Sequence, residues 1–539
     1  MTAEPTRANT LAGVLLDSCR QWPDKVAIKF PGFQWSYGDL AQEAMEIARG
    51  LKSIGVRRGD HVGILLPNGA DFVRSFFGVA LASAVGVTLN VRYRRSDLSY
   101  VIAKSNIRVL ILSAEYRAHF NFEELVADLL QEGKFPLLEK VVVLGTDEAG
   151  SFIAESAFRK SGSDVSIDAL QAEACRVSLR DPCSMLFTSG TTAFPKGCVL
   201  SHEAVVRTAA AWTRYGIHMT ESDTIWIPNP LFHIGALTTL VASVACGSRF
   251  MSLPYFDADL AVDMLCQEEV TVFFPVFDTV AMPILDHPRA SELKMDKVRY
   301  CFTIGNPMNI ERMKAYLPDA QHINVYGMTE TSGWCIFNLD MSEKGGPFGG
   351  GFSIPGVEFK LRYLDSAGTG GEQRIGEICI RSWCTLTEYY EEPEATAKAI
   401  DADGWFHTGD IGWVGEGGRL HFHGRLGEML KVGGENVAPM ELEVLIGSHD
   451  AVRHVAVVGV PDARLGQVPA AFIELKPGAS FDAAQVIDFC RDQVARFKLP
   501  RHVRFVQASE WPMSATKIRK EDLRKQLTAE LDASEKSGR

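Results

Sequence analysis

The chain has 539 residues, of which 46% are hydrophobic and 23% charged, and its formal net charge at pH 7 is -12. This length exceeds what one hydrophobic core supports, so we expect two or more domains, and the negative charge argues against a general nucleic-acid or membrane-surface partner, whose phosphates would be repelled. The eleven cysteines include no Cys-x-x-Cys pair, which favours free thiols in a reducing compartment over disulfides or zinc.

The start of the chain, MTAEPTRANT, has neither a basic leader nor a long apolar core, so we expect no signal peptide. Two long apolar stretches, 76–89 and 235–247, are too short to cross a bilayer and predict buried elements instead. We therefore expect a cytoplasmic protein without stable membrane insertion.

From residue 11 to about 180, helical patterns alternate with short apolar runs at 26–30, 61–66, 109–112 and 141–144. Such alternation predicts an α/β unit with a mostly parallel sheet. Three arginines lie in the stretch 89–102, which we interpret as a solvated helix start capped by Ser96.

Residues 184–197, SMLFTSGTTAFPKG, combine a predicted strand at 185–187 with a loop of hydroxyls and glycines. We expect Gly190 and Gly197 to adopt unusual φ values, so that backbone amides point inward and can hold phosphate. The loop is not a Walker A motif, because Pro195 stands where that motif needs a glycine. A plain surface turn is the alternative. The candidate ligands are Thr188, Ser189, Gly190, Thr191, Thr192 and Lys196.

The next segments give a helix capped by Ser201 and running to about residue 215, and then a proline-containing stretch, WIPNPLFHIGA, at 226–236. The prolines exclude a regular helix and leave Phe232 and His233 on a loop. A single histidine beside a phenylalanine is more often a packed or surface residue than a catalytic one.

Two predicted strands at 298–309 and 323–333 each end in a loop, with the sequences IGNPMN and YGMTETSG. Ligands of open α/β sheets bind beyond the carboxyl ends of strands, so these loops are placed to share one crevice. Glu330 offers an oxygen ligand for Mg²⁺ and Thr329 a hydroxyl for phosphate, and Tyr326 offers a ring face for adenine. A solvated glutamate is the alternative.

The stretch GWFHTGDIG at 404–412 sets Asp410 between glycines. Its carboxylate can accept two hydrogen bonds from the vicinal hydroxyls of a ribose, although an Asx turn would also suit it. Further on, Pro439 predicts a helix start. Strands at 452–460 and 470–475 and a helix at 482–497 predict a compact α+β domain, which ends with PMSATKIRK at 512–520.

These strings, in this order, resemble the adenylate-forming superfamily, which includes acyl-CoA synthetases, firefly luciferase and the adenylation domains of peptide synthetases. The chain is most similar to acyl-CoA synthetases of the fatty-acid or carnitine/crotonobetaine-CoA ligase type. The resemblance implies an α/β fold with a large, multi-subdomain N-terminal domain of mostly parallel sheets at 1–424. A hinge at 425–428 and a small, mobile α+β domain at 429–539 follow.

Three positions depart from the family pattern. Ala193 replaces the usual glycine of the phosphate loop, a change small enough to leave the loop working. Gly427 stands at the hinge, where Asp or Lys is usual, so rotation remains possible but a side-chain hydrogen bond is lost. The tail has Thr516-Lys517 without the intervening glycine of the family.

The resemblance also implies roles for individual residues. Lys517, with Lys520 as the fallback, would bind the acid and the bridging oxygen, Glu330 would hold Mg²⁺, and Thr329 and His233 would complete the catalytic group. The implied CoA contacts are Lys431, Gly433 and Gly434, and the implied acyl pocket is lined by Phe232, Gly235, Val276, Phe277, Thr331 and Trp334. Besides the phosphate loop, the implied ATP and AMP contacts are Gly305, Asn306, Pro307, Tyr326, Gly327, Met328, Asp410 and Arg425.

The implied reaction joins a carboxylate to the α-phosphorus of ATP, releases pyrophosphate and then passes the acyl group to CoA. The apolar pocket predicts a fatty, aryl or alicyclic acid. Transfer to a carrier protein, a short polar acid such as crotonobetaine or carnitine, a luciferase-like oxygenase and a non-enzymatic adenylate-binding protein are the alternatives. The partners expected are therefore small molecules, and the sequence leaves a homodimer open.

Overall fold

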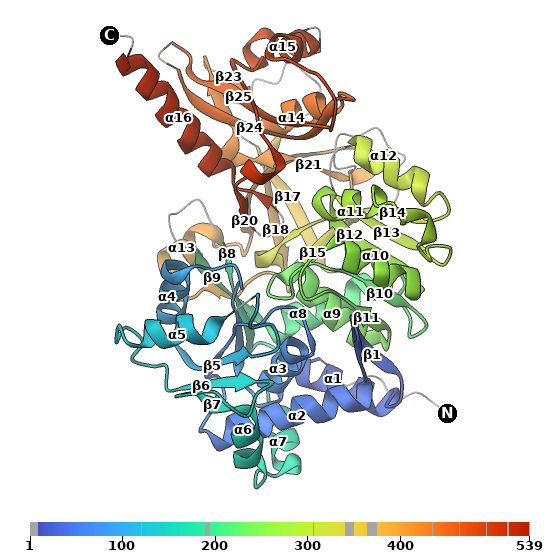
Figure 1. Cartoon of the computed structure of the whole chain (residues 1–539), viewed down its shortest axis with the longest axis vertical. Helices are drawn as coiled ribbons and strands as arrows, with labels where there is room; N and C mark the ends of the chain where they lie inside the picture. The colour runs from blue at the N-terminus through green and yellow to red at the C-terminus, as the bar shows by residue number, and fades with distance from the viewer. Residues whose placement is uncertain are drawn as a thin grey trace.

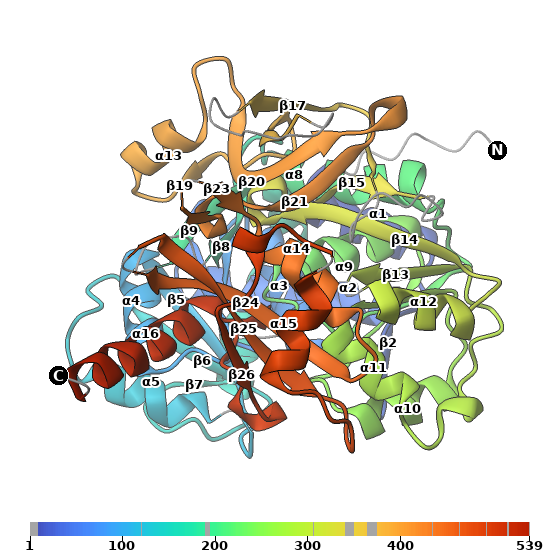
Figure 2. The ribbon, with the colours of Figure 1, turned by 90° about the horizontal axis from the view of Figure 1, so that it is seen from above.

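The computed structural model describes residues 9–537 except 120, 189–194, 305–306, 340–349, 364–373, 434, 463, 492 and 515–516. Its described part contains two large sheets, a smaller four-stranded sheet and a separate C-terminal sheet. Figure 1 shows the C-terminal sheet and its helices at one end of the long axis, and Figure 2 shows them from above, over the large sheets.

The first large sheet has eight strands in the order β19-β9-β8-β4-β3-β5-β6-β7, and the pairs from β4–β8 through β6–β7 are parallel. Alternate side chains of its strands enter different cores, as the pleat of a strand requires. Val109 and Ile111 lie in the central core, whereas Leu110 and Leu112 face the outer one. The strands are β3 His61–Ile64, β4 Val85–Thr88, β5 Ile107–Ser113, β6 Lys140–Leu144, β7 Ile153–Ala154, β8 Pro182–Thr188, β9 Lys196–Ser201 and β19 Glu388–Tyr389.

The second large sheet has nine strands in the order β16-β15-β14-β13-β12-β10-β11-β1-β2, parallel from β14 to β1. The sequence pattern grouped residues 26–30 with the strands of the first sheet, which is wrong, because β1 pairs with β11 instead. The strands are β1 Val26–Phe30, β2 Phe33–Ser36, β10 Thr224–Trp226, β11 Arg249–Met251, β12 Val272–Phe277, β13 Tyr300–Ile304, β14 Gln321–Met328, β15 Gly333–Asn338 and β16 Phe352–Ser353.

Helices form three layers around these sheets, and the central layer shares one continuous core with both of them. The apolar stretches at 76–89 and 235–247 contribute α3 and α9 to that layer, and both helices are buried as predicted. The central helices are α1 Leu11–Gln21, α2 Tyr37–Ser53, α3 Ala70–Leu81, α8 His202–Ala211 and α9 Ile234–Cys246, with α6 Glu155–Gly162 and α7 Ile167–Ala174 against α2. The outer helices are α4 Arg95–Lys104 and α5 Phe122–Leu130 on the first sheet and α10 Ala258–Gln267, α11 Asp278–Leu285 and α12 Pro307–Tyr316 on the second.

Local signals for helix starts hold in two places and fail in a third. Ser201 caps α8 by accepting a hydrogen bond from the amide of Ala204, and Pro439 is the first residue of α14. Ser96 does not cap α4, which begins at Arg95 because the carboxylate of Asp97 accepts the Arg94 amide at 3.1 Å. The helix predicted at 482–497 is also shorter than expected.

The C-terminal sheet has the order β23-β22-β25-β24, with β26 beside β25. α14 and α15 cover one face and α16 the other, so alternate residues of β24 and β25 fill two separate cores. The strands and helices of this part are β22 Leu430–Val432, β23 Glu435–Val437, α14 Pro439–Gly447, β24 Val452–Asp462, β25 Gly466–Leu475, α15 Ala483–Arg491, β26 His502–Phe505 and α16 Lys520–Ser537. β27 Met513–Ser514 and β28 Lys517–Ile518 pair with each other in a separate two-stranded sheet.

A four-stranded antiparallel sheet, β17-β18-β20-β21, lies between the large sheets and the C-terminal elements in Figure 1. Its elements are β17 Val357–Tyr363, β18 Gly376–Ser382, α13 Pro393–Ala399, β20 Phe406–Val414 and β21 Leu420–Arg425. The short helical turns of the chain are η1 Trp212–Gly216, η2 Ala290–Glu292, η3 Thr329–Thr331, η4 Glu416–Gly418, η5 Leu426–Glu428, η6 Arg496–Lys498 and η7 Ala508–Glu510.

Candidate active site

The phosphate-loop segment is an antiparallel hairpin of β8 and β9, and Thr188 lies opposite Lys196 at the end that adjoins the connecting loop. Lys196 is therefore a strand residue and not part of the loop itself. Gly197 does not use an unusual φ, contrary to the expectation; instead, a Cβ there would lie 3.0 Å from the Met185 sulfur. Glycine at this position makes room for close packing within the hairpin. Residues 189–194, with the predicted ligands Ser189, Gly190, Thr191 and Thr192, lie outside the described residues.

Glu330 lies beside this hairpin, although the two are far apart in the sequence. The Thr188 hydroxyl donates to Glu330 Oε1 at 3.3 Å, and the Tyr389 hydroxyl donates to the same oxygen at 3.0 Å. Lys196 Nζ lies 5.2 Å from the centre of the Tyr389 ring, within the range of a cation–π contact. The structure thus joins Thr188, Lys196 and Glu330 around one tyrosine.

Tyr389 is a functional candidate that sequence reasoning missed. It is 9% exposed, and burial raises its pKa, as does the neighbouring Glu330 carboxylate. The phenol therefore stays protonated and donates its hydrogen to Glu330. Backbone bonds hold the segment around it, because the Leu386 amide donates to the Glu330 carbonyl and the Tyr390 amide to the Gly197 carbonyl, both at 2.8 Å.

Asp410 is the centre of a second group. Its Oδ2 accepts the Tyr326 hydroxyl at 2.9 Å, and its Oδ1 lies 3.1 Å from Arg425 Nε. Asp410 is 3% exposed and belongs to strand β20, so it is not the residue of a free Asx turn. Burial and the Asp410 carboxylate together raise the pKa of Tyr326, which therefore remains a donor. Three predicted nucleotide contacts thus meet at one carboxylate.

Between these two groups, the YGMTE segment turns sharply. A Cβ on Gly327 would lie 1.9 Å from the Gly333 carbonyl oxygen, so only glycine fits there. The Thr331 hydroxyl accepts the Met328 amide at 3.0 Å and donates to the Gly333 carbonyl at 2.9 Å. Thr331 is buried and holds this turn, while Thr329 begins it and is half-buried.

Apolar candidates for the acyl pocket surround the start of α9. Phe232 is buried, and its ring lies 4.7 Å from that of His233, which is exposed. A Cβ on Gly235 would lie 2.6 Å from Trp334 Cζ2, so the indole fills the space that this glycine leaves. Trp334 also lies 6.0 Å from the Phe274 ring.

Two further pocket candidates end strand β12. Val276 is buried with a φ of +66°, which is rare for a branched side chain. Phe277 is half-buried and precedes α11. Asp278 is the first residue of that helix, and its Oδ2 accepts the Asn309 side-chain amide at 2.8 Å.

Several predicted residues are not joined to these groups by any described contact. Gly305, Asn306 and Gly434 lie outside the described residues, and Pro307 is the first residue of α12. Lys431 is exposed in β22, and Gly433 follows with a φ of +60°.

The two candidate lysines of the tail differ. Lys517 lies in β28, but its side chain is outside the described part of the chain. Lys520 Nζ lies 2.8 Å from Glu443 and 3.5 Å from Glu428. Burial by itself lowers the pKa of Lys520, and the two carboxylates raise it above its ordinary value. Lys520 is therefore engaged in ion pairs with both carboxylates.

The first group offers a hydroxyl, a lysine and a fixed carboxylate, and the second offers a buried carboxylate beside an arginine. These are chemical features that suit a nucleoside triphosphate. All eleven cysteines, each within the described residues, are free thiols. None of the helices that the structure describes combines the length and the hydropathy of a membrane span.

Comparisons with known proteins show the family of the chain. Residues 15–390 match the model of the AMP-binding enzyme family, and residues 441–517 match the AMP-binding enzyme C-terminal domain. The chain is 30% identical to the 3-[(3aS,4S,7aS)-7a-methyl-1,5-dioxo-octahydro-1H-inden-4-yl]propanoyl:CoA ligase of Rhodococcus jostii, with 94% of this chain and 96% of that protein covered. It is 31% identical to the long-chain-fatty-acid–CoA ligase FadD13 of Mycobacterium tuberculosis, with coverage of 92% and 93%.

Among solved structures, the chain is similar to the anthranilate CoA ligase AuaEII in complex with anthranoyl-AMP. The TM-score is 0.85 at 27% identity, and 98% of this chain and 99% of that chain are covered. The fold expected from the sequence, with its large α/β domain and smaller C-terminal domain, is thereby confirmed. The chain belongs to the AMP-binding enzyme family, and within it to the AMP-forming acid–thiol ligases, the acyl-CoA synthetases.

Proposed function

We propose that this enzyme activates an apolar carboxylic acid, fatty, aryl or alicyclic, and transfers it to CoA. The contact between Trp334 and Gly235 carries this proposal, because it places an aromatic side chain in the predicted acyl wall. Phe232 and Val276 add buried apolar surface to the same wall. The relatives named above act on a fused-ring propanoyl group, a long-chain fatty acid and anthranilate.

The phosphates of ATP would lie at the loop end of the β8–β9 hairpin. We assign the β- and γ-phosphates to the loop after Thr188 and to Lys196, whose charge offsets theirs. Asp410 would accept hydrogen bonds from the ribose hydroxyls, and Arg425 would lie beside the ribose and the α-phosphate. The ring of Tyr326 would face the adenine.

Glu330 has the chemistry of a magnesium ligand. Mg²⁺ prefers oxygen donors, and the Thr188 and Tyr389 hydroxyls hold one carboxylate oxygen of Glu330 in a fixed direction. When bound, the ion neutralises negative charge on the phosphate oxygens. Thr329, at the start of the same turn, would donate its hydroxyl to a phosphate.

We also propose that residues 1–424 and 429–539 are separate domains joined by a hinge at 425–428. The cores support this division, because the two C-terminal cores consist of residues from 430 onward. Rotation at the hinge would bring Lys517 to the acid for adenylation and Lys431, Gly433 and Gly434 to CoA for transfer. His233 would border the acyl pocket during both adenylation and transfer.

We place the reaction in the cytoplasm, and the eleven free thiols support a reducing compartment. Size-exclusion chromatography with light scattering tests the homodimer that the sequence leaves open.

Pyrophosphate release tests the proposed function. It is measured with ATP, Mg²⁺ and a panel of acetate, octanoate, palmitate, benzoate, cinnamate and crotonobetaine, with and without CoA. We expect steady turnover that requires CoA and an apolar acid, and a loss of about a hundredfold in Lys517→Ala, since one oriented charge is worth that much in a transition state. Lys525→Ala, exposed on α16, is the control. A preference for crotonobetaine or acetate would contradict the apolar pocket, and full activity of Lys517→Ala would contradict the assigned lysine.

A further inference from the structure

Strand β20 carries a bulge directly before the carboxylate of Asp410. Glu377 of β18 is paired with Ile411, and Cys379 is paired with His407, so the register shifts between these two pairs. Residues 408–410 of β20 therefore oppose a single residue of β18. Gly409 has a φ of +70° within the bulge, a conformation that glycine adopts without strain.

Side-chain bonds fix the two residues that flank Gly409. The Thr408 hydroxyl donates to the Ile378 carbonyl at 2.7 Å and accepts the Asp410 amide at 3.0 Å. The Gly409 amide donates to Glu377 Oε1 at 3.2 Å. The bulge thus depends on a carboxylate of the neighbouring strand.

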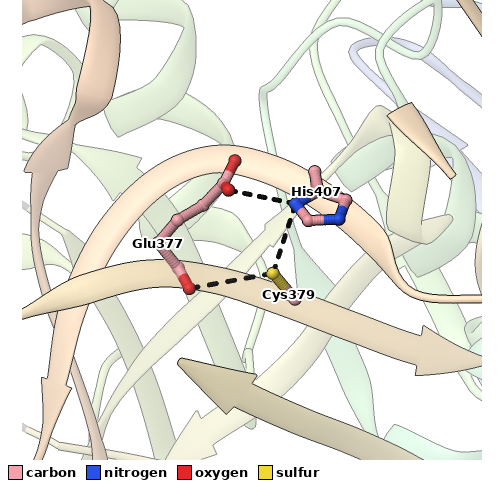
Figure 3. Close-up of side chains that lie close together, drawn as sticks. All are labelled: Glu377, Cys379 and His407. Atoms are coloured by element: carbon pink, nitrogen blue, oxygen red, sulfur yellow. Dashed lines mark hydrogen bonds and ion pairs between the residues drawn. The ribbon is translucent and has the colours of Figure 1, made fainter. Parts of the chain in front are cut away.

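Glu377 is 4% exposed, and its other oxygen is also bonded. Oε2 lies 3.0 Å from His407 Nδ1 and 2.6 Å from an Arg362 nitrogen. Burial by itself raises the pKa of Glu377, but His407 and Arg362 lower it overall, so the group is ionised at neutral pH. Figure 3 shows Glu377 and Cys379 on one strand, facing His407 on the next.

A metal site is the alternative interpretation of this cluster, because the ligand atoms of Glu377, Cys379 and His407 lie within 4.8 Å of one another. The bonds already present speak against it. Both oxygens of Glu377 accept hydrogen bonds. Burial, followed by the charge of Glu377, raises the pKa of Cys379 to about 11, and a protonated thiol is a poor metal ligand.

We propose that Glu377 is a positioning residue for the nucleotide: it holds the 408–410 bulge and thereby directs the Asp410 carboxylate toward the ribose. The inference rests on the proposed ribose contact of Asp410. Asp410 Oδ2 lies 2.9 Å from the Tyr326 hydroxyl, and Asp410 Oδ1 lies 3.1 Å from Arg425 Nε. A small rotation of β20 would break both contacts. Supporting residues of this kind hold functional side chains in their productive orientation.

The test is a double-mutant cycle on nucleotide affinity. We measure the Kd of AMP by calorimetry, and the KM of ATP and of the acid, for Glu377→Ala, Asp410→Asn and the double variant. Glu377→Ala should raise the Kd of AMP and the KM of ATP about tenfold and leave the KM of the acid unchanged. If Glu377 acts through Asp410, the double variant should be no worse than Asp410→Asn alone.

Glu377→Gln and the control Arg381→Met complete the design. The glutamine oxygen still accepts the Gly409 amide, so we expect the Kd of AMP to rise only about threefold in Glu377→Gln. This variant provides the test if the alanine variant fails to fold. Arg381 lies on the same strand, β18, but pairs with Glu358 instead of Glu377, so its variant should bind AMP normally.

Additive effects in the cycle, or an unchanged AMP affinity in a folded Glu377 variant, would overturn the inference. An unchanged affinity in Asp410→Asn would instead overturn the proposed ribose contact.

Discussion

Tyr389 shows how one phenol can hold the carboxylate of Glu330, the proposed magnesium ligand. Its hydroxyl donates to Glu330 Oε1 at 3.0 Å, and its ring faces Lys196. A hydrogen bond to a charged group contributes about 1.5–3 kcal/mol. We expect Tyr389→Phe to lower kcat/KM for ATP by a factor of about 10 or more, measured by pyrophosphate release at saturating acid.

The neighbouring tyrosine supplies the control for that measurement. The Tyr390 hydroxyl accepts the Asn106 side-chain amide at 3.0 Å, away from Glu330. Tyr390→Phe should therefore keep the wild-type kcat/KM. Equal losses in the two variants would show that Tyr389 acts only through packing.

His202 makes stability depend on pH. It is 2% exposed, its Nδ1 accepts the Leu11 amide at 3.1 Å, and burial lowers its pKa to about 4, against a weaker opposing effect of Asp181. A histidine with a lowered folded pKa stabilises the protein above its unfolded pKa of about 6.5, and that stability is lost as pH falls toward 4.

We therefore expect the Tm of the wild type to fall more steeply between pH 6.5 and pH 4 than that of His202→Asn, whose side-chain oxygen still accepts the Leu11 amide. Differential scanning calorimetry across this range measures the two slopes. Parallel curves would contradict a buried, neutral His202.

At the scale of elements, the sequence predicts well where chemistry depends on a local pattern. The strand at 185–187, the cap at Ser201 and the helix start at Pro439 follow from neighbouring residues. Tyr389 could not be predicted in this way, because its role comes from the pairing of β19 with β9, about two hundred residues away in sequence. Strand β1 was misplaced for the same reason.

The contact of β15 with α9 should control the length of acid that the enzyme accepts. Trp334 fills the space above Gly235, so Trp334→Ala should open the acyl pocket and admit longer acids. Each buried methylene contributes about 0.8 kcal/mol, and we expect the ratio of kcat/KM for palmitate over octanoate to rise at least about tenfold.

Trp35→Ala, on the edge strand β2, is the control, and its ratio should stay at the wild-type value. An unchanged ratio in a folded Trp334→Ala would show that the indole does not border the acid.

At the scale of the whole molecule, an ion-pair group joins the last helix to the predicted hinge. Lys520 of α16 lies 2.8 Å from Glu443 of α14 and 3.5 Å from Glu428 of η5. Gly427 offers no side chain there, so Lys520 supplies the contact that holds this arrangement. If the domains rotate between the two half-reactions, breaking the pair must affect one half-reaction more than the other.

We therefore expect Lys520→Ala to change adenylation and thioester formation unequally, by about three- to tenfold in their ratio. Pyrophosphate exchange measures the first step, and acyl-CoA formation from added acyl-AMP measures the second. Lys525→Ala, exposed on the same helix, should leave the ratio unchanged. Equal changes in both steps would contradict a role at the hinge.

In the proposed reaction, the carboxylate of an apolar acid attacks the α-phosphorus of ATP before CoA takes the acyl group. The acid is supplied with both oxygens as ¹⁸O, and the AMP formed with CoA present is analysed by mass spectrometry. Attack at phosphorus leaves one acid oxygen bridging the acyl-AMP, and attack of the thiol on the carbonyl then releases it with AMP. We predict AMP that carries one ¹⁸O atom. Unlabelled AMP, formed while the enzyme produces acyl-CoA, would contradict attack of the carboxylate at the α-phosphorus.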